Sequence, residues 1–162
     1  MTGGALHPSA QRVADALVAA GVAGRVLQFE ASTRTAADAA AALCCDVGAI
    51  ASCLVFVADD EAIVVITSGA HRVDTALLAG SIGAAAIRMA NAKEVRAATS
   101  QPIGGVAPVN WPSTLPVYID ADLEQYVEIW SAAGTPNAVF PTTYEELRRL
   151  TGAIPKAVVE HG

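Results

Sequence analysis

The sequence predicts a mixed α/β (α+β) fold with a curved, partly closed, mixed or antiparallel barrel-like sheet flanked by helices. The chain has 162 residues, the size of one domain, and such a domain buries roughly 70% of its unfolded surface. Two apolar, β-branched runs, 53–57 and 62–67, are separated by the polar stretch 58–61, which predicts a hairpin. Helical segments do not alternate strictly with strands, so a doubly wound nucleotide-binding fold is not indicated.

The first elements follow from capping and periodicity. We expect residues 1–8 to be a loose tail and residues 9–162 to form the domain. Ser9 is a candidate N-cap for a helix through Ala19, with Gly21 ending it. Residues 25–29 alternate as a strand does. Thr35 with Asp38 resembles a capping box for an alanine-rich helix that reaches residue 44.

The later elements alternate less regularly. Asp74 is expected to cap a helix over 75–79, and Asn91 with Glu94 to frame one that ends at residue 99. Thr143 with Glu146 predicts the last long helix, which Gly152 stops. We expect short strands over 86–89, 116–120, 126–132 and 138–140, and a terminal strand or extended tail over 153–159.

Composition restricts the class of function. The net charge is −6 and the pI about 4.9, which argues against DNA binding and against strong non-specific nucleic-acid binding, but not against local contact with an RNA end. No apolar run reaches the ~20 residues of a membrane span, and the N-terminus lacks a secretory signal. We therefore expect a soluble cytoplasmic protein. The spacing of its three cysteines and three histidines fits no metal site, and no cofactor is predicted.

Two glycine-containing loops are candidate ligand sites. In IGGVAP, 103–108, adjacent glycines let a ligand approach the backbone, whose N–H groups could bind an oxyanion; a plain turn is the alternative. In AGTPN, 133–137, Thr135 and Asn137 offer hydrogen bonds, although turn chemistry alone explains such residues.

Several segments together resemble one family. IASCLVF (50–56), TRTAADAAAAL before it, RMANAKEVRAATSQPIGGVAP after it, LPVYID and AGTPNAVF are similar, in order and spacing, to the YbaK/ProX family. These proteins are free-standing relatives of the editing domain of prolyl-tRNA synthetase. The resemblance covers about residues 9–158 and implies the YbaK fold.

The resemblance implies an aminoacyl-tRNA deacylase that hydrolyses the ester of mischarged tRNA. Such editing is needed because one methylene gives a synthetase only ~1–3 kcal/mol of discrimination. The family loop that lines the substrate pocket matches Gly104 to Pro108, which implies an oxyanion role for Gly104 and Gly105 and substrate contact for Pro108. The glycine turn across the pocket matches Gly134, which makes Thr135 and Asn137 substrate-contacting candidates. A hydroxyl of the terminal ribose is implied to assist the attacking water.

The chain departs from the family at one position. The family lysine, implied to hold the phosphate and ribose of the tRNA end, falls at Ser52, and the serine after it falls at Cys53. We expect Ser52 to face the pocket and Cys53, one residue later on a strand, to pack into the core. Arg34, next to Thr35 on a segment that borders the pocket in the family, is the first candidate for the missing charge. His71, Arg72 and Arg88 are the others.

Three functions remain open at this point. The first is a trans-editing deacylase whose partners are the 3′ end of aminoacyl-tRNA, weakly bound, and a cognate synthetase. The second is a catalytically weakened or inactive pocket that binds a small ligand or a protein partner. The third is a hydrolase for another small ester. The lost lysine favours the last two, whereas the intact IGGVAP and AGTPNAVF segments favour a working pocket.

Overall fold

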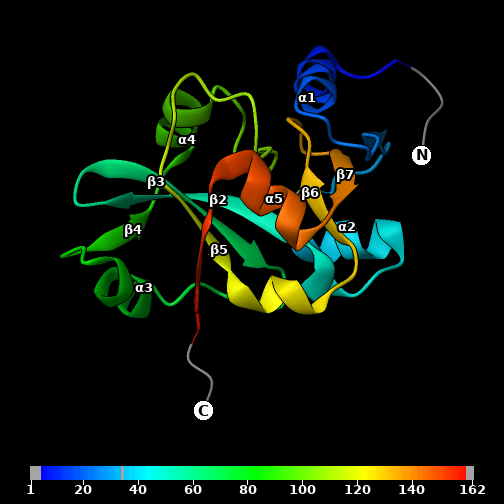
Figure 1. Ribbon diagram of the computed structural model, residues 1–162. Coiled ribbons are helices and arrows are strands. Elements are labelled where there is room, and N and C mark those ends of the chain that lie inside the picture. Colours follow the sequence, from blue (N-terminus) through cyan, green and yellow to red (C-terminus); the bar gives the residue numbers. More distant parts are fainter. Residues whose placement is uncertain (1–4, 34, 160–162) are drawn as a thin grey trace.

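The computed structural model describes residues 5–33 and 35–159 and confirms a mixed α+β fold (Figure 1). The described helices are α1 (Pro8–Ala19), α2 (Ala36–Leu43), α3 (Thr75–Ile82), α4 (Ala92–Thr99) and α5 (Tyr144–Thr151), with 3₁₀ turns η1 (Val47–Ala49) and η2 (Ala121–Gln125). The strands are β1 (Leu27–Gln28), β2 (Ala51–Ala58), β3 (Glu61–Ser68), β4 (Ile87–Met89), β5 (Val117–Asp120), β6 (Ile129–Ala132), β7 (Ala138–Thr142) and β8 (Ile154–Lys156).

The larger sheet has five strands in the order β4-β2-β3-β5-β8. Its centre is the predicted hairpin of β2 and β3, which pair antiparallel from Ala51↔Ser68 to Ala58↔Glu61. Asp59 and Asp60 both have positive φ angles, 48° and 71°, as the two central residues of a type I′ turn require. β5 and β8 are parallel to their neighbours, so this sheet is mixed.

The smaller sheet has three antiparallel strands in the order β1-β7-β6. A single parallel bridge, Ile50↔Trp130, links it to the start of β2. The two sheets do not close into a barrel, yet one core fills the space between them. This core includes Val55, Ile66 and Ile119 from the larger sheet and Ile129 from the smaller one. A cavity lined in part by residues of this core, among them Cys53 and Val55, lies at its edge.

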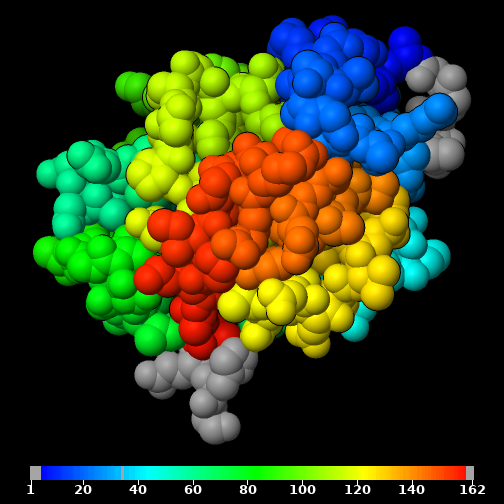
Figure 2. All heavy atoms as spheres, in the orientation of Figure 1, coloured from blue at the N-terminus to red at the C-terminus, as the bar shows by residue number. Residues whose placement is uncertain are grey.

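Most helices begin where their capping residues predicted. Thr35, Asp74, Asn91 and Thr143 each accept a backbone N–H of the following helix, and the Asn91–Glu94 pair forms a complete capping box. α5 lies on the face of the molecule that Figure 2 presents, with η2 along its lower edge. No helix in the described ranges is long and apolar enough to cross a bilayer.

Several expected boundaries differ from the observed ones: α3 continues to Ile82 instead of residue 79, and β1 is limited to Leu27–Gln28 of the expected 25–29. Two further differences concern α1 and β6. Ser9 does not cap α1: His7 does, since its Nδ1 accepts the Ser9 N–H at 3.1 Å and Pro8 takes the first helical position, where its missing N–H costs nothing. β6 begins at Ile129 rather than at residue 126 because the Asp120 carboxylate accepts the Asp122 N–H at 3.0 Å and starts η2.

Candidate functional site

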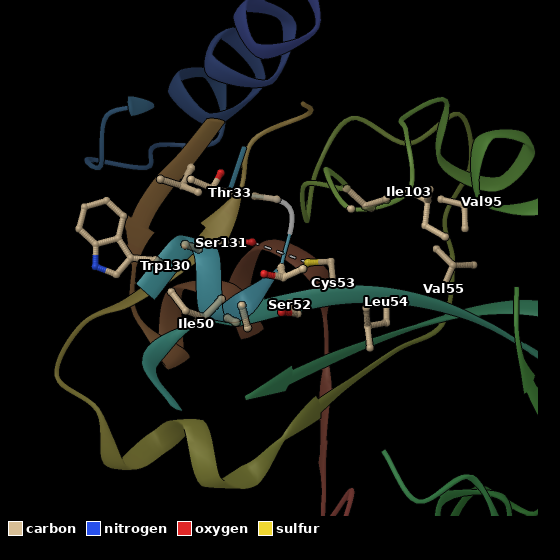
Figure 3. Close-up of a pocket in the computed structure, with 18 of the residues that line it drawn as sticks. Thr33, Ile50, Ser52, Cys53, Leu54, Val55, Val95, Ile103, Trp130 and Ser131 are labelled. Carbon is tan, nitrogen blue, oxygen red and sulfur yellow. Dashed lines mark hydrogen bonds between the residues drawn. The ribbon is translucent and has the colours of Figure 1, made fainter. Parts of the chain in front are cut away.

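A cavity lies where the two sheets, α2, α4 and the glycine loop meet (Figure 3). Its volume is about 80 Å³, several times the roughly 10–15 Å³ that one water needs on the same measure. The space therefore suits several waters or a small aminoacyl group. Its lining comes from Thr33, Thr35, Ala36, Ala39, Ile50–Val55, Met89, Ala90, Val95, Ile103, Gly104, Val106, Trp130–Ala132 and Val139.

The lining is neutral throughout the part of the chain that the structure describes. Its polar side chains are hydroxyls and one thiol, those of Thr33, Thr35, Ser52, Ser131 and Cys53, and the other lining residues are apolar or glycine. A protein carboxylate or imidazole is thus not available among them as a general base. Chemistry in this cavity would depend on backbone donors and on groups that a ligand brings with it.

Cys53 faces the cavity, which corrects the expectation that it would pack only into the core. Its side chain is 8% exposed and joins the shared core with Ala51 and Val55, but its Sγ also lies 3.7 Å from Ser131 Oγ (Figure 3). Burial raises the pKa of the thiol to about 12. Cys53 is therefore a neutral thiol at physiological pH and not an activated nucleophile.

Ser52 also lines the cavity, but its side chain is on the opposite face of β2 from that of Cys53. It is half-buried and pairs with Thr67 of β3. Because side chains alternate along a strand, Ser52 shares its side with Leu54, which Figure 3 shows directed away from Cys53 and Val55. A hydroxyl at this position carries no charge, so it cannot replace a lysine in binding phosphate.

The glycine loop forms a type II turn at the rim of the cavity. Gly105 N–H donates to the Pro102 carbonyl at 3.0 Å, and Gly104 takes the left-handed φ of +84° that the third residue of such a turn needs. The N–H groups of Gly104 and Val106 donate to no acceptor within residues 5–33 and 35–159. Two backbone donors of lining residues are thus available to an oxyanion.

A buried glutamine holds this loop in place. Gln101 is 4% exposed, and its Oε1 accepts the Ala107 N–H at 2.7 Å. Its Nε2 donates to the Val109 carbonyl at 2.9 Å. Trp111 Nε1 donates to the Ala107 carbonyl at 2.9 Å, so both backbone groups of Ala107 are fixed. The unusual backbone of the glycine loop is therefore supported from below by polar contacts.

The AGTPN turn packs directly against the glycine loop. Gly134 N–H donates to the Gly105 carbonyl at 2.8 Å, and Gly134 has a φ of +93°. A Cβ on Gly105 would lie 2.6 Å from the carbonyl carbon of Thr135. Both glycines are thus required by close backbone contact, which places the two predicted loops side by side.

Thr135 and Asn137 serve the turn itself. Thr135 Oγ1 donates to Asn137 Oδ1 at 2.9 Å, and Asn137 Nδ2 donates to the Phe29 carbonyl at 2.6 Å. The Pro136 carbonyl accepts the Thr33 N–H at 2.7 Å. Neither Thr135 nor Asn137 is among the lining residues; they anchor the segment that delivers Thr33 and Thr35 to the cavity.

The remaining predicted residues differ in where they lie relative to the cavity. Ser52, Thr35 and Gly104 line the cavity, and Gly105 and Gly134 lie behind it. Pro108 borders a separate hollow with residues 109–115, 150 and 151. Arg34 falls outside the described residues, although its neighbours Thr33 and Thr35 both line the cavity.

The other candidate cations are not among the lining residues. Arg88 forms a two-point pair with the Glu94 carboxylate at 2.8 Å. His71 Nδ1 lies 2.7 Å from Asp120, and its Nε2 lies 3.5 Å from Asp122. These three residues are close enough together to hold a cation, but the imidazole bridges the two carboxylates. Arg72 is exposed on the loop that follows β3.

The structure corrects the expectation that Gly104 and Gly105 supply the backbone donors, because the Gly105 N–H donates to Pro102 and the available second N–H is that of Val106. The sequence interpretation therefore missed Val106 and three further residues of the site. Thr33 and Ser131 are buried and line the cavity, and Gln101 positions the loop. The alternation of residues 129–132 could have assigned Ser131 to the buried side with Ile129, but only the packing of the two sheets brings it to Cys53. A glutamine directly before the Pro-Ile-Gly-Gly turn gave no comparable signal.

The class of protein with this fold and this neutral, glycine-rimmed cavity is identified by comparison with known proteins. The family model described as the aminoacyl-tRNA editing domain matches residues 30–150. The chain belongs to this family, whose members include the YbaK-type proteins. It is 30% identical over 127 residues to the uncharacterized protein YwhH of Bacillus subtilis, covering 78% of this chain and 80% of that one.

Solved structures agree with this assignment. One, described as a candidate trans-editing enzyme for prolyl-tRNA synthetase, superposes with a TM-score of 0.90 at 42% identity, over 97% of this chain and 100% of that one. The hypothetical protein APE2540 superposes with a TM-score of 0.81 at 30% identity, over 89% and 96% of the two chains. The likeness thus includes the whole architecture that positions the cavity.

Proposed function

We propose that this protein is a trans-editing aminoacyl-tRNA deacylase, which hydrolyses the ester between a wrong amino acid and the 3′ end of a tRNA. The observation that carries the proposal is the small neutral cavity lined by Gly104 and Val106, two residues whose N–H groups bond to no other described residue. A developing oxyanion is stabilised by such donors, and the loss of one typically costs ~10²–10³ in rate. Membership of the editing-domain family supports the same assignment.

The proposed reaction needs no protein nucleophile. A water attacks the ester carbonyl carbon, and the negative charge on the carbonyl oxygen is held by the backbone donors of the glycine loop. The bond to the ribose oxygen then breaks, and the proton lost by the water reaches that oxygen through the neighbouring ribose hydroxyl. Free amino acid and tRNA leave. This route fits a cavity whose described lining has no ionisable base and whose Cys53 thiol is held neutral.

Ser52 makes a second candidate function worth testing. Ser52 takes the position of the family lysine, and the described residues that line the cavity include no Lys, Arg or His. A cavity of this kind could bind a small ligand or a protein partner without turnover. The two functions differ in one respect that can be measured, the release of amino acid from aminoacyl-tRNA.

The test is deacylation of labelled tRNAs charged with proline, alanine, cysteine and serine, by wild type and by Ser52→Lys. Hydrolysis by wild type supports editing, and the panel identifies the amino acid. We expect Ser52→Lys to raise tRNA affinity or deacylation rate, because an ammonium group can bind phosphate. Ser52→Met is the matched control, similar in length but uncharged. A silent wild type beside an active Ser52→Lys would favour the binding function, and hydrolysis confined to small esters would favour an esterase.

A further inference from the structure

The segment from residue 88 to residue 106 has an inner side and an outer side with different chemistry. Six of its residues line the cavity: Met89, Ala90, Val95, Ile103, Gly104 and Val106. Lys93 and Arg96 are exposed on α4, whose buried residues are Val95 and Thr99. The helix that forms one wall of the cavity therefore carries two cations on its solvent face.

These two cations are available to a ligand. Residues 88–96 contain three basic residues and one acidic residue, in a chain whose net charge is −6. Glu94 is already occupied, since its carboxylate binds Arg88 at two points and accepts the Asn91 N–H. Lys93 and Arg96 have no ion-pair partner among the residues that the structure describes. The segment is thus a local positive patch on an acidic protein.

The position of the patch distinguishes it from other surface charge. Ten residues of the chain are Lys or Arg, and four of them, Arg34, Arg88, Lys93 and Arg96, lie within or directly beside the lining segments 33–39 and 89–106. Of these, Arg88 is already paired with Glu94. Arg25 and Arg72, for example, are exposed on segments that contribute none. The cations of α4 therefore lie on a segment that also borders the cavity, whereas Arg25 and Arg72 do not.

The rim of the cavity adds an apolar contact beside the patch. Met89 is 58% and Ile103 37% exposed, and both are large apolar residues that also line the cavity. Figure 3 shows Ile103, Val95 and Val55 at one end of the cavity and Ile50 and Trp130 at the other. Single exposed apolar side chains are common, but two on the rim of one cavity offer a surface for the flat face of a base.

We infer that the solvent face of α4 and the Met89–Ile103 rim form the surface that holds the single-stranded 3′ end of an RNA. Lys93 and Arg96 contact its phosphates, and Met89 and Ile103 contact its terminal base. This inference rests on the proposed deacylase function and extends it, because it assigns to α4 the cationic role that Ser52 cannot fill. It identifies the ligand by its chemistry, a polyanion that ends in an unpaired base.

The test is binding of an uncharged, labelled RNA hairpin with a short single-stranded 3′ end, measured as a function of salt concentration. In Lys93→Gln/Arg96→Gln, we expect weaker binding and a salt slope that is smaller by about 1.4, at ~0.7 per phosphate contact to a single strand. Arg25→Gln/Arg72→Gln removes the same charge elsewhere and should leave the slope unchanged. Met89→Ser/Ile103→Ser should weaken binding several-fold without changing the slope.

The outcomes separate this surface from the deacylase proposal. Equal loss in both charge variants would overturn the inference, since only overall charge would then matter. It would also be overturned by wild-type protein that fails to bind the hairpin at low salt, or by an α4 variant with unchanged affinity and slope. Because the RNA carries no amino acid, none of these results depends on ester hydrolysis, which tests the proposed function separately. Thermal unfolding of each variant checks that the fold is retained.

Discussion

The contact between the two glycine loops can be tested with one methyl group. In Gly105→Ala, the new Cβ would lie 2.6 Å from the carbonyl carbon of Thr135, 2.8 Å from its oxygen and 3.0 Å from Pro136 N. All three neighbours are backbone atoms, so no side-chain rotation relieves the clash. Ordinary contact begins at 3.4 Å, and the two loops must therefore separate by roughly 0.8 Å, or otherwise deform.

The energetic cost follows from this displacement. Overpacking of a close contact costs about 1–3 kcal/mol, and the Gly134 N–H bond to the Gly105 carbonyl, 2.8 Å long, contributes about 1 kcal/mol. We expect Gly105→Ala to lower the free energy of unfolding by about 2–4 kcal/mol, or Tm by ~4–16 °C. Since the same shift moves the backbone donors of the cavity rim, deacylation should fall by ~10–10²-fold.

Urea unfolding and single-turnover deacylation measure the two effects. Gly80→Ala is a matched control, because Gly80 lies within α3 and a Cβ there meets nothing within 4 Å. It should stabilise the protein by about 0.5–1 kcal/mol, as Ala does in a helix, and leave activity unchanged. A Gly105→Ala protein with wild-type stability and rate would refute the reasoning that these loops form one rigid unit.

Three further predictions concern the same site. Gly104→Val should abolish deacylation, because valine is strained at a φ of +84° and would move the donors; undiminished turnover would exclude this role for the loop. Gln101→Leu should cost about 1–3 kcal/mol in urea unfolding by leaving the Ala107 N–H without its acceptor, and it should lower kcat more than it raises KM; wild-type stability and rate in this variant would contradict the assignment. The pKa of Cys53 is raised from 9.0 to about 12, so the unfolded chain ionises first and stability should fall as pH rises from 9 towards 12, by about 1.4 kcal/mol per pH unit. Cys53→Ala should remove the part of this dependence that Cys53 contributes, so the slope of stability against pH should be smaller than in wild type. In native protein at pH 8, iodoacetamide should modify the exposed Cys44 but not Cys53.

Local signals in the sequence predicted most of the fold. Side-chain capping defines the start of α2, α3, α4 and α5 because it depends only on residues within one turn. The β2–β3 hairpin was equally predictable from the sequence, since the intervening Asp59 and Asp60 tolerate positive φ. The parallel pairing of β3 with β5, such as Val64↔Val117, was not predicted because it joins segments far apart in sequence.

The candidate site was less predictable for the same reason. Alternation correctly indicated that Ser52 and Cys53 lie on opposite sides of β2. It could not indicate that Cys53 as well as Ser52 borders the cavity, because that depends on where the smaller sheet packs and brings Ser131 to Cys53. Thr135 and Asn137 were recognised as hydrogen-bonding residues, but their partners, each other and Phe29, became evident only in three dimensions.

The central claim is that a neutral cavity hydrolyses an aminoacyl ester with the help of the substrate's own ribose hydroxyl. The most direct measurement compares single-turnover deacylation by wild-type protein of one mischarged tRNA ending in adenosine or in 2′-deoxyadenosine, both charged on the 3′ oxygen. The account predicts rapid release of the amino acid from the first and a large loss of rate with the second. Equal rates on both substrates would show that a protein group activates the water, and no release from either across the amino-acid panel would contradict a deacylase function.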